Sequence, residues 1–274
     1  MNLNLLKKLC AVPSRTYHED QMVRFLMDLI VQGGDARFGH CWRDRHNNVF
    51  VIKGNAQFYP CVAAHIDTVH PLRTVHIQQE DDVLKAEFRG KQVGFGADDK
   101  GGVYICLELL QKFENIAVAF FASEEFACQG SRKADLSFFT KVGYMLEFDC
   151  PSRGLFSYTC GGRRLFENDG QFIKTALPVL KQHGVVYWQN HPYTDVMAVR
   201  ERTTLSCMNL SCGYYNWHDS HEYLRLSDTA ASLKMAADLI EALDSLRYDF
   251  YRVDNAPPLI EIGCLNVVDR ALHG

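Results

Sequence analysis

The chain of 274 residues contains no long apolar run, no block of charges of one sign and no tract rich in proline or serine. Its longest apolar stretch, Ile116 to Ala122, is far shorter than the roughly 20 residues of a membrane-spanning helix. Lysine and arginine (29) nearly balance aspartate and glutamate (33), which argues against nucleic-acid and membrane partners. No signal-peptide apolar region follows Leu5–Lys8. We therefore expect a cytoplasmic protein with small-molecule or peptide partners.

Closely spaced cysteine pairs are also missing. The ten cysteines form no CxxC pair and lie mostly within apolar runs. A disulfide framework would need an export signal, and a structural zinc site would need closer pairing than that of Cys207 and Cys212. We expect these cysteines to be reduced residues of the core.

The composition, 47% apolar and 23% charged, is typical of a folded globular domain. Helical periodicity predicts helices over residues 22–30, 103–110, 172–180 and 233–240, the last capped by Ser227 or Asp228. Short apolar runs predict strands at residues 48–52, 61–64 (bounded by Pro60), 116–122, 142–148 and 205–210, with a hairpin around residues 80–82. This alternation indicates an α/β three-layer sandwich around a mostly parallel mixed sheet, as a single domain over residues 1–274.

Three of the predicted strands end in polar residues. His65 and Asp67 follow the first, Glu124 and Glu125 the second, and Asp149 the third. In α/β sheets, ligands bind beyond the carboxyl ends of the strands. We therefore expect these side chains to meet at one edge of the sheet.

Imidazole and carboxylate groups recur in this set. The candidate metal ligands are His65, Asp98, Glu125, Asp149 and His218. Such donors suit zinc, with cobalt or manganese as alternatives, and they can hold two ions if one carboxylate bridges them. Taken alone, His65 is more simply a hydrogen-bonded or surface histidine. The combination favours a metal centre.

Two further features have competing interpretations. Asp67 lies two residues after His65, where it can accept the free imidazole N–H, although a strand-end turn aspartate is the simpler reading. The glycines at 94, 96, 101 and 102 are compatible with a phosphate-binding turn. Asp98 and Asp99 within that turn would repel a phosphate, so we favour a tight turn beside the metals.

Five short motifs, in this order, resemble those of the dinuclear zinc exopeptidase superfamily, which includes tripeptidases, glutamate carboxypeptidases, aminoacylases and lidless zinc aminopeptidases. They are Ala64-His65-Ile66-Asp67, Gly96-Ala97-Asp98-Asp99-Lys100-Gly101-Gly102, Ser123-Glu124-Glu125, Phe148-Asp149 and Trp217-His218-Asp219-Ser220-His221-Glu222. The resemblance covers about residues 5 to 244.

The resemblance implies two zinc ions per chain and a role for each motif residue. His65 and Asp149 would bind one ion, Glu125 and His218 the other, and Asp98 would bridge them, with a cis peptide bond between Asp98 and Asp99. Asp67 would steady His65. Glu124 would be the catalytic general base. His221 competes with His218, whose assignment rests on the His-x-x-x-Glu form ending at Glu222.

Many members of this superfamily carry a lid domain after the residue corresponding to Asp149. Here only 69 positions separate Asp149 from His218, so we expect no lid and no requirement for oligomer formation. Asp195 is a candidate partner for a substrate amine or a helix N-cap. Arginines are candidate partners for a substrate carboxylate: Arg163, Arg164, Arg200 and Arg202. Tyr214, Tyr215 and Trp217 would line the pocket or pack in the core.

These observations favour a zinc aminopeptidase that hydrolyses an amide bond in short peptides. A carboxypeptidase or an N-acyl amino acid deacylase of the same superfamily is the alternative. A hypothesis of another class is a non-catalytic member that binds metal or peptide, although Glu124 would have no use there.

Overall fold

The computed structural model describes residues 1–32, 39–185, 187–191, 193–251 and 265–266. Its helices are α1 (Leu3–Ala11), α2 (Asp20–Gln32), α3 (Ala97–Lys112), α4 (Gln129–Lys133), α5 (Gln171–Gln182), α6 (Asp195–Arg202) and α7 (Leu226–Leu243), with a 3-10 helix, η2 (Phe138–Lys141). Its strands are β1 (His40–Arg43), β2 (Val49–Lys53), β3 (Tyr59–His65), β4 (His76–Glu80), β5 (Val83–Phe88), β6 (Lys91–Val93), β7 (Ile116–Phe121), β8 (Val142–Cys150), β9 (Leu155–Cys160), β10 (Arg163–Arg164), β11 (Tyr187–His191), β12 (Cys207–Ser211), β13 (Tyr214–Tyr215), β14 (Tyr223–Arg225) and β15 (Leu265–Asn266).

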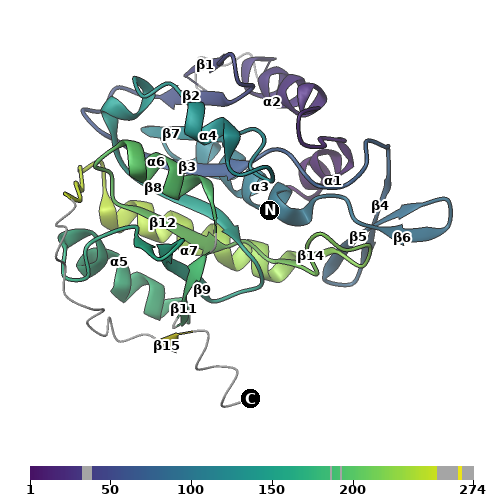
Figure 1. Cartoon of the computed structure of the whole chain (residues 1–274). Coiled ribbons are helices and arrows are strands. Elements are labelled where there is room, and N and C mark those ends of the chain that lie inside the picture. The colour runs from purple at the N-terminus through teal and green to yellow at the C-terminus, as the bar shows by residue number, and fades with distance from the viewer. Residues whose placement is uncertain (33–38, 186, 192, 252–264, 267–274) are drawn as a thin grey trace.

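A ten-stranded mixed sheet forms the centre of the molecule (Figure 1). Its strand order is β1-β2-β7-β3-β8-β12-β9-β11-β15, and β10 pairs with β9. The four strands β7, β3, β8 and β12 run parallel to one another, whereas β1–β2, β2–β7 and β12–β9 are antiparallel pairs. The strands β3, β7 and β8 are mostly apolar and buried at every position, as a sheet covered on both faces requires. The predicted α/β fold is confirmed.

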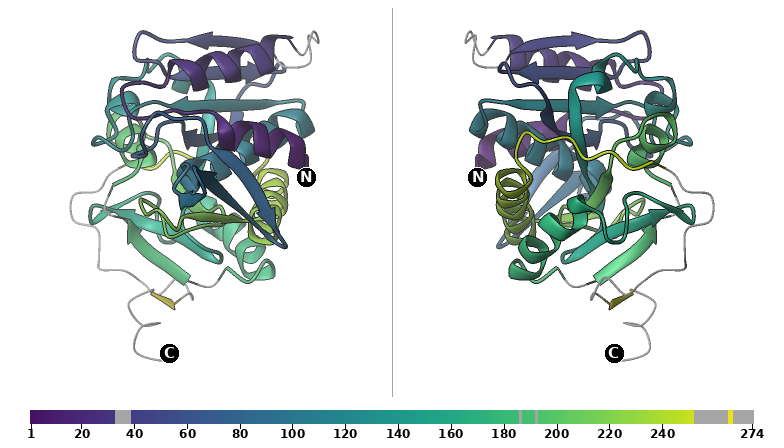
Figure 2. Two further views of the ribbon diagram at one scale, coloured as in Figure 1. Left: turned by 90° about the vertical axis from the view of Figure 1, so that its right-hand side faces the viewer. Right: turned by 90° about the vertical axis from the view of Figure 1, so that its left-hand side faces the viewer.

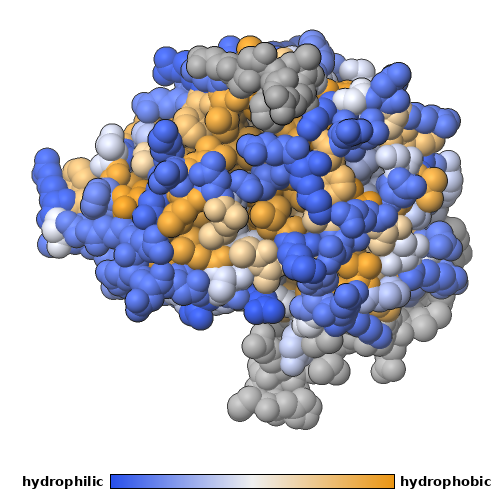
Figure 3. All heavy atoms as spheres, turned by 180° about the vertical axis from the view of Figure 1, so that it is seen from behind, coloured by the Kyte–Doolittle hydropathy of each residue, from blue (hydrophilic) through white to orange (hydrophobic). Residues whose placement is uncertain are grey.

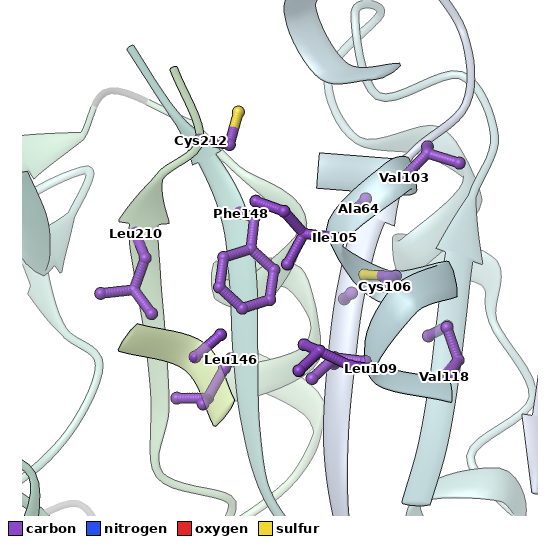
Figure 4. Packing of buried hydrophobic residues seen from close by; sticks show 14 of the residues in the cluster. Ala64, Val103, Ile105, Cys106, Leu109, Val118, Leu146, Phe148, Leu210 and Cys212 are labelled. Carbon is purple, nitrogen blue, oxygen red and sulfur yellow. The ribbon is translucent and has the colours of Figure 1, made fainter. Parts of the chain in front are cut away.

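Helices cover both faces of this sheet. α1, α3 and α7 lie on one side, and α4 and α6 on the other (Figure 2). α3 packs directly on the sheet: Ile105 and Leu109 of the helix face Leu146 and Phe148 of β8 (Figure 4). Because side chains alternate along a strand, Glu147 and Asp149 point to the other side of β8.

A second, smaller sheet projects beside the main one. It consists of antiparallel strands in the order β13-β14-β5-β4, with β6 paired to β5. The predicted hairpin around residues 80–82 is its β4–β5 turn. Asp82 joins this sheet to α7, because its carboxylate accepts hydrogen bonds from the backbone N–H and the hydroxyl of Ser227.

Two local predictions were wrong. Pro60 does not bound β3 but lies inside it, at the point where the register with β8 shifts, so that the missing N–H of proline is tolerated. Ser227 and Asp228 do not cap α7, which already begins at Leu226 after Arg225. The hydroxyl of Ser227 is bonded to Asp82, and Asp228 accepts from the hydroxyl of Tyr215, so neither side chain is used as a cap.

The surface opposite to that of Figure 1 carries apolar residues interspersed among hydrophilic ones (Figure 3). Among the residues described, no helix combines the length and hydrophobicity needed to cross a membrane. The nine cysteines in the described ranges are free, and all except Cys41 are buried, as predicted for reduced core residues. Cys264 lies outside the described residues.

Asn48 ties the end of β7 to α4 and should contribute strongly to stability. It is fully buried; its amide donates to Asp44 and to Gly130 O, and its Oδ1 accepts from Ala122 N (3.1 Å). Asn48→Ala leaves these groups unpaired, so we expect the free energy of unfolding to fall by about 2–3 kcal/mol. Denaturant titration measures this loss. The exposed Asn55→Ala is the control and should change stability by less than about 0.5 kcal/mol; equal effects of the two variants would contradict the assigned role.

Candidate metal centre

Five segments far apart in sequence meet at the carboxyl edge of the parallel strands. β3 ends at His65, the loop after β7 carries Glu124 and Glu125, and Asp149 lies near the end of β8. The first turn of α3 supplies Asp98, and the loop between β13 and β14 supplies His218. The buried apolar strands are rigid supports, which explains why the polar groups at their ends hold fixed positions.

The imidazoles and carboxylates form one connected cluster. His65 Nε2 lies 3.1 Å from Asp98 Oδ1 and 3.6 Å from Asp149 Oδ1. His218 Nε2 lies 2.9 Å from Glu125 and 3.5 Å from Asp98 Oδ2. The two oxygens of Asp98 therefore face the two histidines. His221, the competing choice, is exposed and bonded to Asp219.

Asp99 is a buried member of the cluster that the sequence pattern did not single out as a ligand. Donor atoms of His65, Asp99 and Asp149 lie within 4.8 Å of one another, as do those of His65, Asp98 and Glu125. The Asp99 carboxylate accepts from Gly102 N (3.0 Å), and a side chain at position 102 would come within 2.5 Å of both its oxygens. The peptide bond between Asp98 and Asp99 is cis. Gly102 is thus needed for the close approach of α3 to the Asp99 carboxylate.

Asp67 fixes the backbone of the two neighbouring glutamates. Its carboxylate accepts hydrogen bonds from Glu124 N (2.8 Å) and Glu125 N (3.3 Å), and from the Thr16 hydroxyl (2.9 Å). His65 Nδ1 lies closer to the backbone oxygen of Asp67 (3.1 Å) than to its carboxylate (3.5 Å). Asp67 therefore orients the imidazole mainly through its main chain, and its side chain positions the loop after β7.

Glu222 performs a similar task for Asp98. Its buried carboxylate accepts from the backbone N–H groups of Phe95 and Gly96 (2.8 Å each) and of Asp98 (3.4 Å). His70 Nε2 lies 3.2 Å from the same carboxylate. Burial opposes ionisation, but these contacts lower the pKa of Glu222. Since Glu222 follows His218 by four residues, it couples the two segments that meet at the cluster.

Asp149 has its own set of partners. Its backbone N–H donates to Asn209 Oδ1 (2.7 Å), and the hydroxyl groups of Tyr214 (3.4 Å) and Thr194 (3.3 Å) donate to its carboxylate. Thr194 also donates to Glu147, whose Oε1 has no partner within the described residues. A buried polar network therefore extends beneath the cluster.

The cluster holds more negative charge than its histidines balance. Burial raises the pKa of Asp98 to about 8, and burial also raises the pKa values of Asp99, Glu124 and Glu147. The carboxylates around His65 outweigh its burial and raise its pKa, while His65 lowers that of Asp149 against the effect of burial. A divalent cation at this position would offset the repulsion.

The donor set fits such a cation. Nitrogen and carboxylate donors are the ligands that zinc takes in catalytic sites, and the shared position of Asp98 suits a bridging carboxylate. His65 and Asp98 are buried (1% and 6% exposed), whereas the side chain of His218 is 44% exposed. The cluster is therefore open on the side of His218.

The charged residues predicted to bind the substrate are either buried or engaged in other contacts. Asp195 is fully buried and accepts from Ser131 Oγ; it begins α6 after Thr194, so the N-cap prediction was wrong. The four candidate arginines make contacts elsewhere: Arg163 pairs with Glu201, Arg164 lies over the ring of Phe250, Arg200 donates to Thr203 O, and Arg202 donates to Ser131 O.

The three candidate aromatic residues also differ. Tyr214 is buried against Asp149, and the ring of Tyr215 stacks on that of Tyr223. Trp217, next to His218, is 49% exposed. Of the three, Trp217 is the residue available to a ligand from solvent.

Comparison with known proteins identifies a peptidase family and a shared fold. The model of peptidase family M28 matches residues 47–243. No curated protein sequence is similar enough to match. Among solved structures, the chain resembles aminopeptidase PepT from Bacillus cereus (TM-score 0.74, 12% identity, 88% of this chain and 97% of that one) and a tripeptidase from Staphylococcus aureus (0.73, 12%, 88% and 97%). An aminopeptidase from the archaeon Desulfurococcus kamchatkensis is also similar (0.65, 13%, 91% and 98%). At these identities the likeness shows a shared fold.

Removal of the Glu222 carboxylate tests its structural role. Glu222→Ala leaves three buried N–H groups without their acceptor, and we expect the free energy of unfolding to fall by about 2–4 kcal/mol. Glu222→Gln retains one acceptor oxygen and should lose less. Thermal and denaturant unfolding in the presence of a chelator measures both variants without a contribution from metal binding. Wild-type stability of Glu222→Ala would refute the role.

Proposed function

The chain belongs to peptidase family M28, and on that premise we propose that it is a zinc aminopeptidase that acts on short peptides. Membership of the family makes it a metallopeptidase, a hydrolase of peptide bonds. The finer assignment to aminopeptidases is our inference from the charge of the site. We also propose that residues 1–274 form a single catalytic domain. In support, β9, β11 and β12, which lie between Asp149 and His218, are strands of the main sheet.

We assign the metal ligands by the contacts in the cluster. His65 and Asp149 would hold one zinc ion, Glu125 and His218 the other, and Asp98 both. Zinc bound there would supply Lewis-acid chemistry toward the peptide carbonyl and toward a water molecule, with cobalt or manganese as alternative metals.

Glu124 is the residue that moves the proton. Its backbone is held by Asp67, and its carboxylate lies 3.5 Å from Cys128 Sγ and makes no bond to either histidine. Burial raises its pKa, which makes the carboxylate a stronger proton acceptor. Glu124 takes a proton from water and returns it to the leaving amine.

The excess of carboxyl groups is the observation that carries the aminopeptidase assignment. Eight of them surround the site: Asp67, Asp98, Asp99, Glu124, Glu125, Glu147, Asp149 and Asp195. Two divalent ions would bring four positive charges, so carboxyl groups would remain in excess at the site. The remaining field attracts the ammonium group of a free peptide N-terminus and repels a free carboxylate.

Asp195 and the arginines support the same choice. Asp195 Oδ2 accepts no hydrogen bond from the described residues, and its charge is close enough to raise the pKa of Glu124. A carboxypeptidase or an N-acyl amino acid deacylase would need a cation for the substrate carboxylate. The four arginines predicted for that purpose are engaged in other contacts.

The expectations about cellular location and about oligomer formation stay predictions. A cytoplasmic location is compatible with the free cysteines of the described ranges, because reducing compartments preserve thiols. Activity without oligomer formation follows from the proposed absence of a lid.

Replacement of Glu124 tests the proton-transfer role. We expect Glu124→Gln to lower kcat by about 10²–10⁴-fold, because the amide cannot accept the proton, while zinc content stays close to two ions per chain. Turnover and metal analysis of protein purified without chelator measure both quantities. Glu241→Gln, an exposed α7 variant whose parent side chain pairs with Lys112, is the matched control. Wild-type turnover of Glu124→Gln would remove Glu124 from its role.

A comparison of three substrates tests the aminopeptidase assignment. We expect a peptide amide with a free N-terminus to be hydrolysed with a kcat/KM at least about 100-fold above that of an N-blocked peptide or an N-acyl amino acid, because only the first carries an ammonium group. Hydrolysis of the blocked substrates alone would instead identify a carboxypeptidase or a deacylase.

A further inference from the structure

Two exposed aromatic rings lie against each other beside the candidate metal centre. Tyr17 and Phe126 are 57% and 58% exposed, and their ring centroids are 5.4 Å apart with an interplanar angle of 59°. They come from different parts of the chain, the segment between α1 and α2 and the loop after β7. Large apolar side chains that gather on a surface mark a binding site more often than isolated ones do.

The segment of Tyr17 is bonded to the site. The hydroxyl of the preceding Thr16 donates to Asp67 Oδ2 (2.9 Å). Tyr17 N donates to Glu19 Oε1 (2.8 Å), and the same oxygen accepts from Ser123 Oγ (2.8 Å). Buried Glu19 therefore joins the backbone of Tyr17 to the residue that precedes Glu124.

The loop of Phe126 is closed on itself. Cys128 N donates to Glu124 O (2.8 Å), and Gln129 N donates to Ser123 O (3.0 Å). Ala127 and Cys128 have left-handed backbone angles, with φ of 59° and 53°. The chain turns so tightly that the side chain of Phe126 projects outward, one residue after Glu125.

Tyr17 occupies a backbone conformation that does not favour it. Its φ is 66°, in the left-handed region that bulky side chains rarely adopt and where asparagine or glycine is the usual residue. An exposed tyrosine at such a position gains little from burial. The ring itself, rather than the fold, therefore accounts for its presence.

We propose that Tyr17 and Phe126 form a subsite for a large apolar, preferably aromatic, side chain of the peptide residue next to the scissile bond. This inference rests on the proposed function and adds the class of substrate. The carboxyl groups of the centre interact with the charged and polar parts of a peptide, whereas the two rings offer an apolar surface to its side chain. Their rigid attachment to Asp67 and Glu125 fixes that surface relative to the reacting bond.

Selectivity can be measured with dipeptide amides that carry phenylalanine or alanine at the first or the second position. For the wild-type enzyme we expect kcat/KM to be at least about tenfold higher for phenylalanine at one of these positions. Phe126→Ser and Tyr17→Asn should each reduce that ratio below about threefold, because they lower kcat/KM for the phenylalanine peptide more than for the alanine peptide. Tyr251→Ala removes an aromatic residue that is 66% exposed and follows Phe250, which bonds to Thr204 near the amino end of β12, and this variant should keep the ratio.

Equilibrium binding separates this subsite from the catalytic proposal. In zinc-loaded Glu124→Gln protein, calorimetric titration with Phe-Phe amide and Ala-Ala amide should give Kd values that differ at least about tenfold. Adding Phe126→Ser or Tyr17→Asn should abolish most of that difference. If the wild type hydrolyses no peptide amide, the aminopeptidase proposal is refuted. The ratio of the Kd values of the two peptide amides still tests the subsite in that case. Equal Kd values for the two peptides would overturn the subsite. So would a change of oligomeric state in Phe126→Ser, measured by size exclusion, with unaltered selectivity.

Discussion

The accumulation of carboxyl groups at one buried edge of the sheet is the constraint on which the rest of the structure depends. Each group loses hydration on burial, and each repels its neighbours, so the folded chain must hold them against a considerable electrostatic cost. Only His65 and His218 contact them directly as possible cations within the described ranges. A site that concentrates so much charge is suited to divalent ions, and its structural cost is offset by the apolar strands and α3 beneath it.

Hydrogen bonds to the backbone keep the loops of the cluster in place. Asp67 holds the N–H groups of Glu124 and Glu125, and Glu222 holds those around Asp98. The carboxylates of Asp67 and Glu222 accept hydrogen bonds from main-chain N–H groups and are not assigned as metal ligands. The arrangement explains how loops outside the regular strands can present carboxylates in fixed directions, which catalysis requires. It also ties His218 to Asp98, since Glu222 belongs to the segment of the one and binds the segment of the other.

Residue periodicity and the ends of apolar runs were sufficient to predict the buried strands and the polar residues that follow them. Buried strands ending at His65, near Glu124 and at Asp149 could be recognised because their apolar runs are uninterrupted, and the parallel order then places their ends together. Asp99 and Glu222 stood in the predicted motifs and Asp195 was a candidate amine partner or N-cap, but the buried hydrogen bonds of these residues were not predicted, since an acidic residue carries no local signal of what it contacts. The N-caps failed for the same reason: Ser227 of α7 bonds to Asp82 in the β4–β5 turn, and Asp195 bonds to Ser131. The position of Pro60 inside β3 depends on a register shift that only pairing with β8 reveals.

The order of the strands also determines when the site can assemble. In the central sheet, Cys61 of β3 pairs with Ala117 of β7 and Met145 of β8, both distant along the chain. Such non-local pairings slow folding, because a long intervening segment must close before they gain any contact. The mutually repelling carboxylates thus come together only as the sheet itself forms. Their electrostatic repulsion does not oppose the earlier stages of folding. A polypeptide interrupted before His218 would carry most of the acidic groups without the imidazole that completes the cluster.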